Sequence, residues 1–317
     1  MNSFTQLIGQ KQAVELLQQA VAKNRIAPAY LFSGPSGVGR SLAAKCFSQL
    51  LMCSGIPGEK HPLIEKKLRT GNHPDLLWVQ PTYLHQGKRL SATEAAEAGL
   101  KRKAPPQIRI EQIREITQFL ARPPLEASRS VVIIEDTQTM AEAAANALLK
   151  TLEEPGRATL ILIAPGTDSL LPTLVSRCQR IPFYRLAYED MKQVLWQNGY
   201  EAILENPAVF AIAQGSPGEA ILSWQQLQAI PESLLEKLKQ PPKSSLNALN
   251  IAKEVDKELD TQAQLWLVDY LQYNYWDKSS QRSIIELLEE ARKFLLSYAQ
   301  PRLVWECTLL KIYQNFV

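Results

Sequence analysis

A glycine-rich turn between a predicted strand and a predicted helix constrains the fold more than any other feature of this sequence. The turn follows the apolar run Tyr30 to Phe32 and consists of Gly34, Pro35, Ser36, Gly37, Val38, Gly39, Arg40 and Ser41. It matches the pattern GxxxxGK[ST] at every fixed position except the lysine, which is Arg40 here. Backbone N–H groups in such a turn point inward around phosphate oxygens, and the helix N-terminus adds positive potential. We therefore expect a phosphate-binding loop, although a glycine-rich turn without a ligand has the same pattern.

Apolar periodicity predicts an alternation of strands and helices over about the first 185 residues. The predicted strands are the short apolar or β-branched runs at 30–32, 76–79, 131–134, 159–164 and 179–183. The predicted helices have apolar residues at helical spacing and cover 10–24, 41–52, 110–120 and 141–153. Such alternation is typical of an α/β fold with a parallel sheet and helices on both faces. Residues 81–107 carry glycines and prolines among charges, which favours a loop or an inserted hairpin.

Beyond Ala187 the β-type runs disappear and the sequence has helical period, for example from Ser283 to Leu296. Prolines at 231, 241 and 242 interrupt this all-helical half. A length of 317 residues also suggests two or three domains. The sequence therefore predicts an α/β domain at 1–185 and two helical domains at 186–225 and 226–317.

Composition excludes several classes of protein. Apolar residues make up 45% and charged residues 21%, as in ordinary globular proteins, and the net charge of +3 gives no bulk field for nucleic acid. The four cysteines form no CxxC pair, so a reducing compartment fits best. No basic segment followed by an apolar stretch opens the chain, and no apolar run approaches the roughly 18 residues of a membrane span. We expect a soluble cytoplasmic protein without a membrane partner.

Three residues of the predicted phosphate site depart from the pattern of active P-loop ATPases: one is replaced, and two acids stand in reversed order. Arg40 replaces a compact ammonium with a bulkier planar guanidinium. The strand ending at Ile134 leads into Glu135 and Asp136, where P-loop ATPases place a metal-linked Asp followed by a catalytic Glu. Each carboxylate is then misplaced by about 1 Å, and such an error can cost about 10²-fold in rate. Taken alone, the same strand could simply end in two solvated acids.

Several blocks together resemble the clamp-loader subunits of bacterial DNA polymerase III, which are AAA+ proteins of the delta-prime and tau/gamma types. The resemblance covers roughly the first two thirds of the chain. It rests on Leu7 to Gln10, the loop at Gly34, Gly71 to Asp75, Ile108 to Leu120, Ala143 to Pro155 and Leu174 to Cys178. The Asn146-to-Pro155 stretch and the Ser176-Arg177-Cys178 stretch are specific in combination, whereas a P-loop alone fits many families.

This resemblance implies a P-loop AAA+ domain, a helical lid and a C-terminal collar that assembles a circular hetero-pentamer. It implies ATP or ADP with Mg²⁺ as ligand, tau/gamma and delta subunits as partners, and a sliding clamp loaded on primed DNA through the complex. It also implies that Arg177 is an arginine finger acting on a neighbouring subunit's ATP, although a lone arginine in such a place is usually a surface ion pair.

Departures from the active pattern favour the delta-prime type over the tau/gamma type. They are Arg40, the reversed acids, and Gly218, where the motor subunit's similar stretch carries a nucleotide-sensing Arg. We therefore expect little or no ATPase activity from the chain alone, as a component of the polymerase holoenzyme. Two alternatives stay open: an active motor-type ATPase, and an interaction module whose phosphate loop is empty.

Metal and DNA contacts receive weaker support from the sequence. Many relatives carry a four-cysteine zinc module after the first P-loop helix, but this region offers only Cys53, His61 and His73 without paired spacing. We expect no zinc. The basic clusters at 88–89 and 101–103 lack interleaved aromatics, which favours a solvated surface over a phosphate-binding groove.

Overall fold

The computed structural model describes residues 3–97, 105–279 and 282–315, and the chain divides into two compact units, 1–187 and 188–317. The first boundary lies between Ala187 and Tyr188. The predicted further division of the helical half between 225 and 226 stays a prediction.

The first unit contains a parallel five-stranded sheet in the described residues, with the order β2-β5-β6-β1-β7. The strands are β1 (Ala29–Ser33), β2 (Leu76–Val79), β5 (Ser130–Ile134), β6 (Ala158–Ala164) and β7 (Gln179–Pro182). These five confirm the five predicted strands. Every residue of β5 and of β6 is buried, as expected for central strands covered on both faces.

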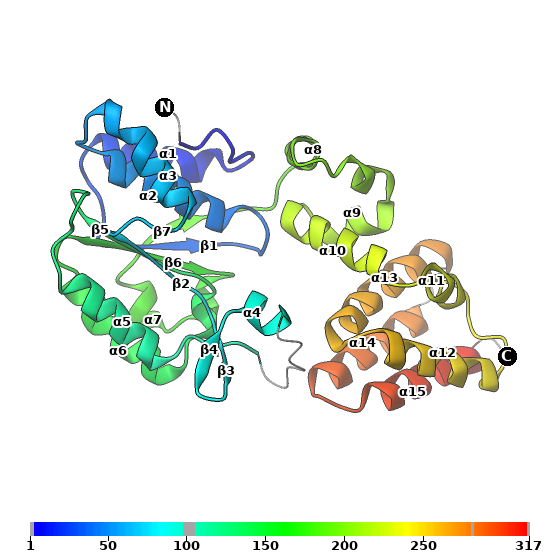
Figure 1. Ribbon diagram of the computed structural model, residues 1–317. Coiled ribbons are helices and arrows are strands. Elements are labelled where there is room, and N and C mark those ends of the chain that lie inside the picture. Colours follow the sequence, from blue (N-terminus) through cyan, green and yellow to red (C-terminus); the bar gives the residue numbers. More distant parts are fainter. Residues whose placement is uncertain (1–2, 98–104, 280–281, 316–317) are drawn as a thin grey trace. The chain divides into compact units, whose positions relative to one another are not determined.

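Helices cover both faces of this sheet, with α1 to α3 on one side and α5 to α7 on the other (Figure 1). Their bounds are α1 (Lys11–Ala22), α2 (Arg40–Cys53), α3 (His61–Arg69), α5 (Ile110–Leu120), α6 (Glu142–Glu153) and α7 (Pro172–Val175). The fold class is thus the predicted α/β class. The sequence did not predict α3, because its apolar residues are few and only Ile64 is buried.

The segment 81–107 begins with the predicted inserted hairpin. Its strands are β3 (Tyr83–His85) and β4 (Lys88–Leu90), which pair antiparallel and precede the short helix α4 (Ala92–Glu97). Thr82 and Gln107 form a bridge at the base of the insert and exchange backbone hydrogen bonds of 3.0 and 3.1 Å. The insert therefore leaves and rejoins the domain at one point, beyond β2.

A buried carboxylate ties the start of β2 to a distant loop. Asp75 accepts hydrogen bonds from the backbone N–H groups of residues 125, 126 and 127 at 2.7, 2.8 and 2.7 Å. Three charge-assisted bonds satisfy a carboxylate that is only 2% exposed. This explains the Asp at the end of the Gly71-to-Asp75 block as a structural residue.

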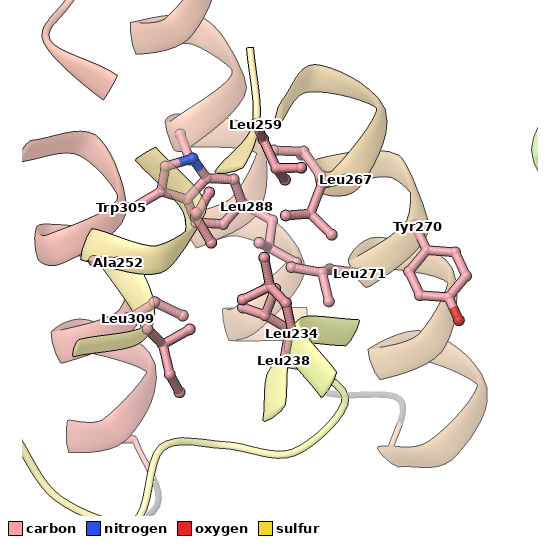
Figure 2. Close-up of a cluster of buried hydrophobic side chains, with 14 of the residues drawn as sticks. Leu234, Leu238, Ala252, Leu259, Leu267, Tyr270, Leu271, Leu288, Trp305 and Leu309 are labelled. Carbon is pink, nitrogen blue, oxygen red and sulfur yellow. The ribbon is translucent and has the colours of Figure 1, made fainter. Parts of the chain in front are cut away.

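The second unit is helical throughout the part of it that the structure describes, as predicted. Its helices are α8 (Tyr188–Gln197), α9 (Pro207–Ala213), α10 (Pro217–Ala229), α11 (Glu232–Leu238), α12 (Ser245–Glu258), α13 (Thr261–Ser279), α14 (Arg282–Leu296) and α15 (Pro301–Gln314). Leucines from α11, α13 and α14 meet Trp305 and Leu309 of α15 in its core (Figure 2). No helix in the described ranges combines the length and apolar character needed to cross a bilayer.

Candidate functional site

The glycine-rich turn lies at the carboxyl end of β1, where a parallel sheet of this kind forms its ligand crevice. Gly34 donates its N–H to Ala164 at the end of β6, at 3.3 Å. A Cβ added at Gly34 would lie 2.3 Å from the carbonyl oxygen of Phe183, and one at Gly39 would lie 2.8 Å from Leu7. Both positions also have positive φ, so conformation favours glycine at both, and the backbone contact requires it at Gly34.

Helix α2 begins directly after this turn and offers unsatisfied N–H groups to it. Gly39 occupies the N-cap position with φ 103°, and no side chain caps the helix. The first N–H groups of a helix need partners from outside the helix, and the macrodipole favours an anion there. The geometry is therefore suited to phosphate oxygens, as the sequence predicted.

The loop and the end of β5 line one pocket of about 300 Å³. This volume is at the lower end of the range for small-molecule sites, about 300–1,000 Å³. The pocket is lined by Ser36, Gly37, Gly39, Arg40, Ser41, Leu42, Glu135, Asp136 and Ile163. It brings together most of the predicted site residues. Gly34, Pro35 and Val38 belong to the same loop but do not line the pocket.

Arg40 is the most unusual group in this pocket. It is 7% exposed, and its Nη1 atom has no hydrogen-bond partner among the described residues. Burial lowers the pKa of Arg40, while Asp136 and Glu135 act in the opposite direction. A guanidinium remains protonated under such a shift. The pocket thus contains a buried cation with an unused donor.

Glu135 and Asp136 lie at the pocket's other wall and are held differently. Glu135 is half-buried and accepts a 2.7 Å hydrogen bond from Nε2 of Gln80, the residue after β2. Asp136 is exposed and has a left-handed backbone, with φ 44° and ψ 50°. A non-glycine residue in this region carries conformational strain, which Asp tolerates better than most residues do. The two acids therefore differ in exposure, in hydrogen bonding and in backbone conformation.

Mg²⁺ prefers oxygen ligands and keeps several waters beside phosphate oxygens. Ser41 and one of the two carboxylates supply oxygens of that kind on this pocket. Among the described residues, no three His, Cys, Asp or Glu side chains are grouped to hold a metal without such a ligand. These donors fit a phosphate-bound Mg²⁺.

A buried glutamine that the sequence did not single out braces the loop. Gln10 donates from Nε2 to the carbonyls of Val38, at 3.2 Å, and Tyr184, at 2.7 Å. Its Oε1 accepts the N–H of Tyr184 at 3.2 Å. These bonds join the segment before α1 to the phosphate loop and to the chain beyond β7. A contact across 174 positions has no local signal, and only the Leu7-to-Gln10 resemblance pointed to this segment.

Arg177 lies far from this pocket. It follows α7 and precedes β7, and its guanidinium donates to Glu153 at 2.7 Å and to the carbonyl of Thr173 at 3.0 Å. Its side chain is 37% exposed. Strand β7 is parallel to β1, with Gln179 opposite Tyr30 and Pro182 opposite Ser33. Arg177 therefore lies at the amino edge of the sheet and the loop at the carboxyl edge, at least about 10 Å apart.

The three residues considered for zinc have separate local roles. His73 is buried and its Nδ1 accepts the N–H of Asp75 at 3.2 Å, while burial lowers the pKa of His73 and keeps the ring neutral. A ring nitrogen of His61 contacts the carbonyl of Ile56 at 3.0 Å, and Cys53 ends α2. The expectation of no zinc stays a prediction.

The basic clusters of the insert are only partly described. Lys88 and Arg89 lie on β4, and Arg89 pairs with Glu115 of α5 through its two terminal guanidinium nitrogens, Nη1 and Nη2. The second cluster, residues 101–103, lies outside the described residues.

A parallel sheet in the order found here, a phosphate loop after β1 and a following helical unit define a P-loop protein of the AAA+ class. Residues 9–187 match the family described as DNA polymerase III, delta subunit, which covers more than half of the chain. The chain belongs to this family. Residues 189–312 also match the family described as cyanobacterial DNA polymerase III delta prime, C-terminal domain.

Individual relatives agree with this assignment. Subunit delta' of Bacillus subtilis is 33% identical over 189 residues, which cover 57% of this chain and 50% of that protein. Subunit delta' of Pseudomonas aeruginosa is 32% identical over 212 residues, covering 64% and 57%. Subunit tau of Bacillus subtilis is 30% identical over 188 residues, covering 58% and 29%. The chain thus spans about half the length of the delta' relatives that it matches.

One solved structure shares the fold along nearly the whole chain. It is a DNA polymerase III gamma subunit-related protein from Thermotoga maritima, with a TM-score of 0.57 over 96% of this chain and 99% of that one. At 17% identity this likeness concerns the fold alone.

Proposed function

We propose that this chain works in DNA replication as a delta-prime-type subunit of a clamp loader, which holds a nucleotide that it does not split. The family match and the delta' relatives support the assignment to this kind of subunit. The observation that carries the proposal is Arg40, a buried cation with an unused hydrogen-bond donor at the N-terminus of α2.

Binding follows from the cost of leaving that donor unpaired. A buried polar group without a partner costs about 1–3 kcal/mol, and a charged group costs more. A phosphate oxygen of ATP or ADP would satisfy Nη1 and accept from the free N–H groups of α2 at the same time. The residues proposed to hold the nucleotide are those of the loop, Gly34 to Ser41, with Glu135 and Asp136 at the opposite wall.

Weak or absent ATP hydrolysis follows from the reversed order of the two acids, Glu135 and Asp136. In the proposed site the longer Glu135 takes the place of a metal-linked Asp, and the shorter Asp136 takes the place of a water-activating Glu. Glu135 is also engaged by Gln80. Arg40 adds a planar guanidinium where a lysine ammonium approaches the β and γ phosphates in active P-loop enzymes.

A trans role for Arg177 follows from the sheet register. Because Arg177 is at the amino edge of the sheet, it cannot reach the loop of its own domain without a large rearrangement. Any contact of its guanidinium with a γ-phosphate is therefore with the nucleotide of another subunit. Its ion pair with Glu153 is half exposed, and such pairs contribute at most about 1 kcal/mol. A phosphate can therefore compete for the guanidinium.

Partners and assembly are part of the same proposal. We place the chain in a hetero-pentamer with tau/gamma and delta subunits, where it helps to load a sliding clamp on primed DNA. Residues 186–225 would form a lid and residues 226–317 a collar that joins the subunits.

Titration with a fluorescent ATP analogue tests the nucleotide site directly. We expect saturable binding to the purified chain, weaker binding to the Arg40→Ala variant, and no turnover above background. Turnover that collapses in Arg40→Ala would instead assign the chain to the motor type. Absence of binding at millimolar analogue would leave an interaction module with an empty loop.

Reconstitution with tau/gamma and delta subunits tests Arg177. The Arg177→Ala variant should assemble normally but lower the ATPase rate of the complex by about tenfold or more, since an arginine finger contributes a large factor to turnover. Arg177→Lys keeps the charge but loses the planar fork and should recover only part of the rate. Arg180→Ala, an exposed arginine three residues further on, is the matched control.

A further inference from the structure

A second and larger groove lies in the first unit, beside β2. Its volume is about 1270 Å³, and it runs between α2, α3, β2 and the first residues of the chain. Leu42 and Glu135 line both this groove and the phosphate pocket. The nucleotide proposal makes no use of the rest of it.

The groove runs along β2, the outermost strand of the sheet in the described residues. Leu76, Leu77 and Trp78 all line it, although successive residues of a strand point to opposite faces. Leu77 packs against the core that α5 and α6 cover, so its side chain is on the face away from α2. A groove that touches three consecutive residues runs along the strand itself. In the described residues, β2 pairs only with β5, and its outer edge has no strand partner.

An unpaired edge offers backbone N–H and C=O groups to any extended segment. Added strands bind in this way, with main-chain hydrogen bonds for affinity and side-chain pockets for specificity. Apolar lining from Leu68, Leu76 and Trp78 suits alternate apolar side chains of such a segment. The edge geometry therefore favours a peptide in extended conformation.

The charges around the groove favour an acidic occupant. Lys66 and Arg69 of α3 line it, are exposed, and have no carboxylate partner in the described ranges. The two carboxylates of the groove are already engaged by amides, since Gln49 donates to Glu65 and Gln80 donates to Glu135, each at 2.7 Å. Lys45, Lys66 and Arg69 outnumber Glu65 and Glu135 along the groove, so its lining carries a net positive charge.

A nucleic-acid strand fits this surface less well than a peptide. Single-stranded nucleic acid binds by stacking bases on exposed aromatic faces. Trp78 is the aromatic residue of the groove, and the ammonium of Lys45 lies over its ring, 5.3 Å from the centroid. We propose that the edge of β2 binds an extended, acidic peptide segment of a partner protein, which adds a strand to the sheet and pairs its carboxylates with Lys66 and Arg69.

Binding of a defined probe to the full chain tests this proposal. The probe is a fluorescein-labelled peptide of four Val-Glu repeats, measured by anisotropy and by amide hydrogen exchange. We expect saturable binding and slower exchange at residues 76–79. The Lys66→Glu/Arg69→Glu variant should bind at least about fivefold more weakly, because two attractions become repulsions. The matched control Lys23→Glu/Arg25→Glu reverses two exposed charges that do not line the groove and should leave binding unchanged.

Two further probes distinguish the ways in which the proposal can fail. The same peptide with alternate backbone nitrogens methylated cannot form strand hydrogen bonds, and equal affinity for it would overturn strand addition. A labelled oligo-dT that binds in place of the peptide, with the same sensitivity to Lys66→Glu/Arg69→Glu, would assign the groove to nucleic acid. If the peptide does not bind at concentrations up to 1 mM, its binding free energy is weaker than about −4 kcal/mol, and the proposal is overturned as well. None of these outcomes depends on nucleotide binding, so the proposed function is tested separately.

Discussion

The two units of this chain are stabilised by different kinds of contact. In the first unit, parallel strands from distant parts of the sequence bring their backbones together, and single side chains such as Gln10 and Asp75 tie loops to them. In the second, helices pack side chain against side chain around Trp305 and Leu267 (Figure 2). The first arrangement aligns polar groups at strand ends, where a site can form, whereas the second provides a large apolar core.

Helix α13 shows the difference most clearly. Residues 266, 267, 268, 270 and 271 are all buried, and at 3.6 residues per turn they cover roughly 200° of the helix circumference. A buried face this wide lets α13 pack against both α9 and α14. In the sheet unit the central element is β6, which is buried along its whole length.

The largest expected effect concerns the helical core. Trp305 is 0% exposed, and its indole donates to Gln264 at 2.9 Å. Trp305→Ala should lower the free energy of unfolding of the second unit by about 3–5 kcal/mol, through lost burial and a cavity. Urea titration followed by hydrogen exchange in each unit measures this. Trp196→Ala, at a tryptophan 66% exposed, is the control and should stay within about 0.5 kcal/mol. Equal loss of stability in both units would contradict the view that this apolar core stabilises the second unit alone.

The next effect concerns a polar tie in the sheet unit. Asp75→Asn removes the charge that accepts three backbone N–H groups and turns an amide toward them. The loss should be about 2–3 kcal/mol, because hydrogen bonds to charged groups are strong and their buried donors are left unsatisfied. Thermal unfolding measures it, with Asp168→Asn on an exposed turn as the control. A change below about 0.5 kcal/mol would show that this unit depends on apolar burial alone.

Arg40 is expected to have opposite effects on stability and binding. Arg40→Met keeps much of the side-chain volume and removes a charge buried without a full set of partners. The nucleotide-free chain should gain about 1 kcal/mol, while affinity for Mg-ADP should fall by about tenfold. Calorimetry on the same samples measures both. Lys45→Met removes a positive charge from the exposed face of α2 and should change neither by a comparable amount.

The smallest effect on stability at neutral pH concerns a polar group in the helical core, the Tyr275 hydroxyl. The Tyr275 hydroxyl donates to the carbonyl of Leu238 at 3.1 Å, and burial raises the pKa of Tyr275 to about 12. The unfolded chain then loses this proton first, at about pH 10, so the contribution of Tyr275 to stability is present below pH 10 and is lost as the pH rises toward 12. Tyr275→Phe should cost about 1 kcal/mol at pH 7 and lessen the fall in stability between pH 10 and 12. Equal pH profiles for the two proteins would contradict this.

Most of the sheet unit could be predicted from local patterns. Strands buried on both faces are short apolar runs, and the phosphate loop is continuous in sequence. Helices α3 and α4 were missed because they bury few residues and lie in polar stretches. Within the helical unit the period predicted helices but not their packing partners, since pairing α12 with α15 depends on contacts about 50 residues apart.

The amino-acid sequence by itself determined the fold class, the phosphate loop with Arg40 in place of lysine, and the reversed order of Glu135 and Asp136, because each of these is a property of neighbouring residues. Tertiary structure alone decided that Arg40 is buried with a donor unused, that Gln10 braces the loop, and that Arg177 lies at the opposite edge of the sheet from its own pocket. It also left the outer edge of β2 without a strand partner in the described residues, beside a groove lined by Lys66 and Arg69. These features depend on strand register and on contacts between residues far apart in the chain, and no local pattern encodes such distances.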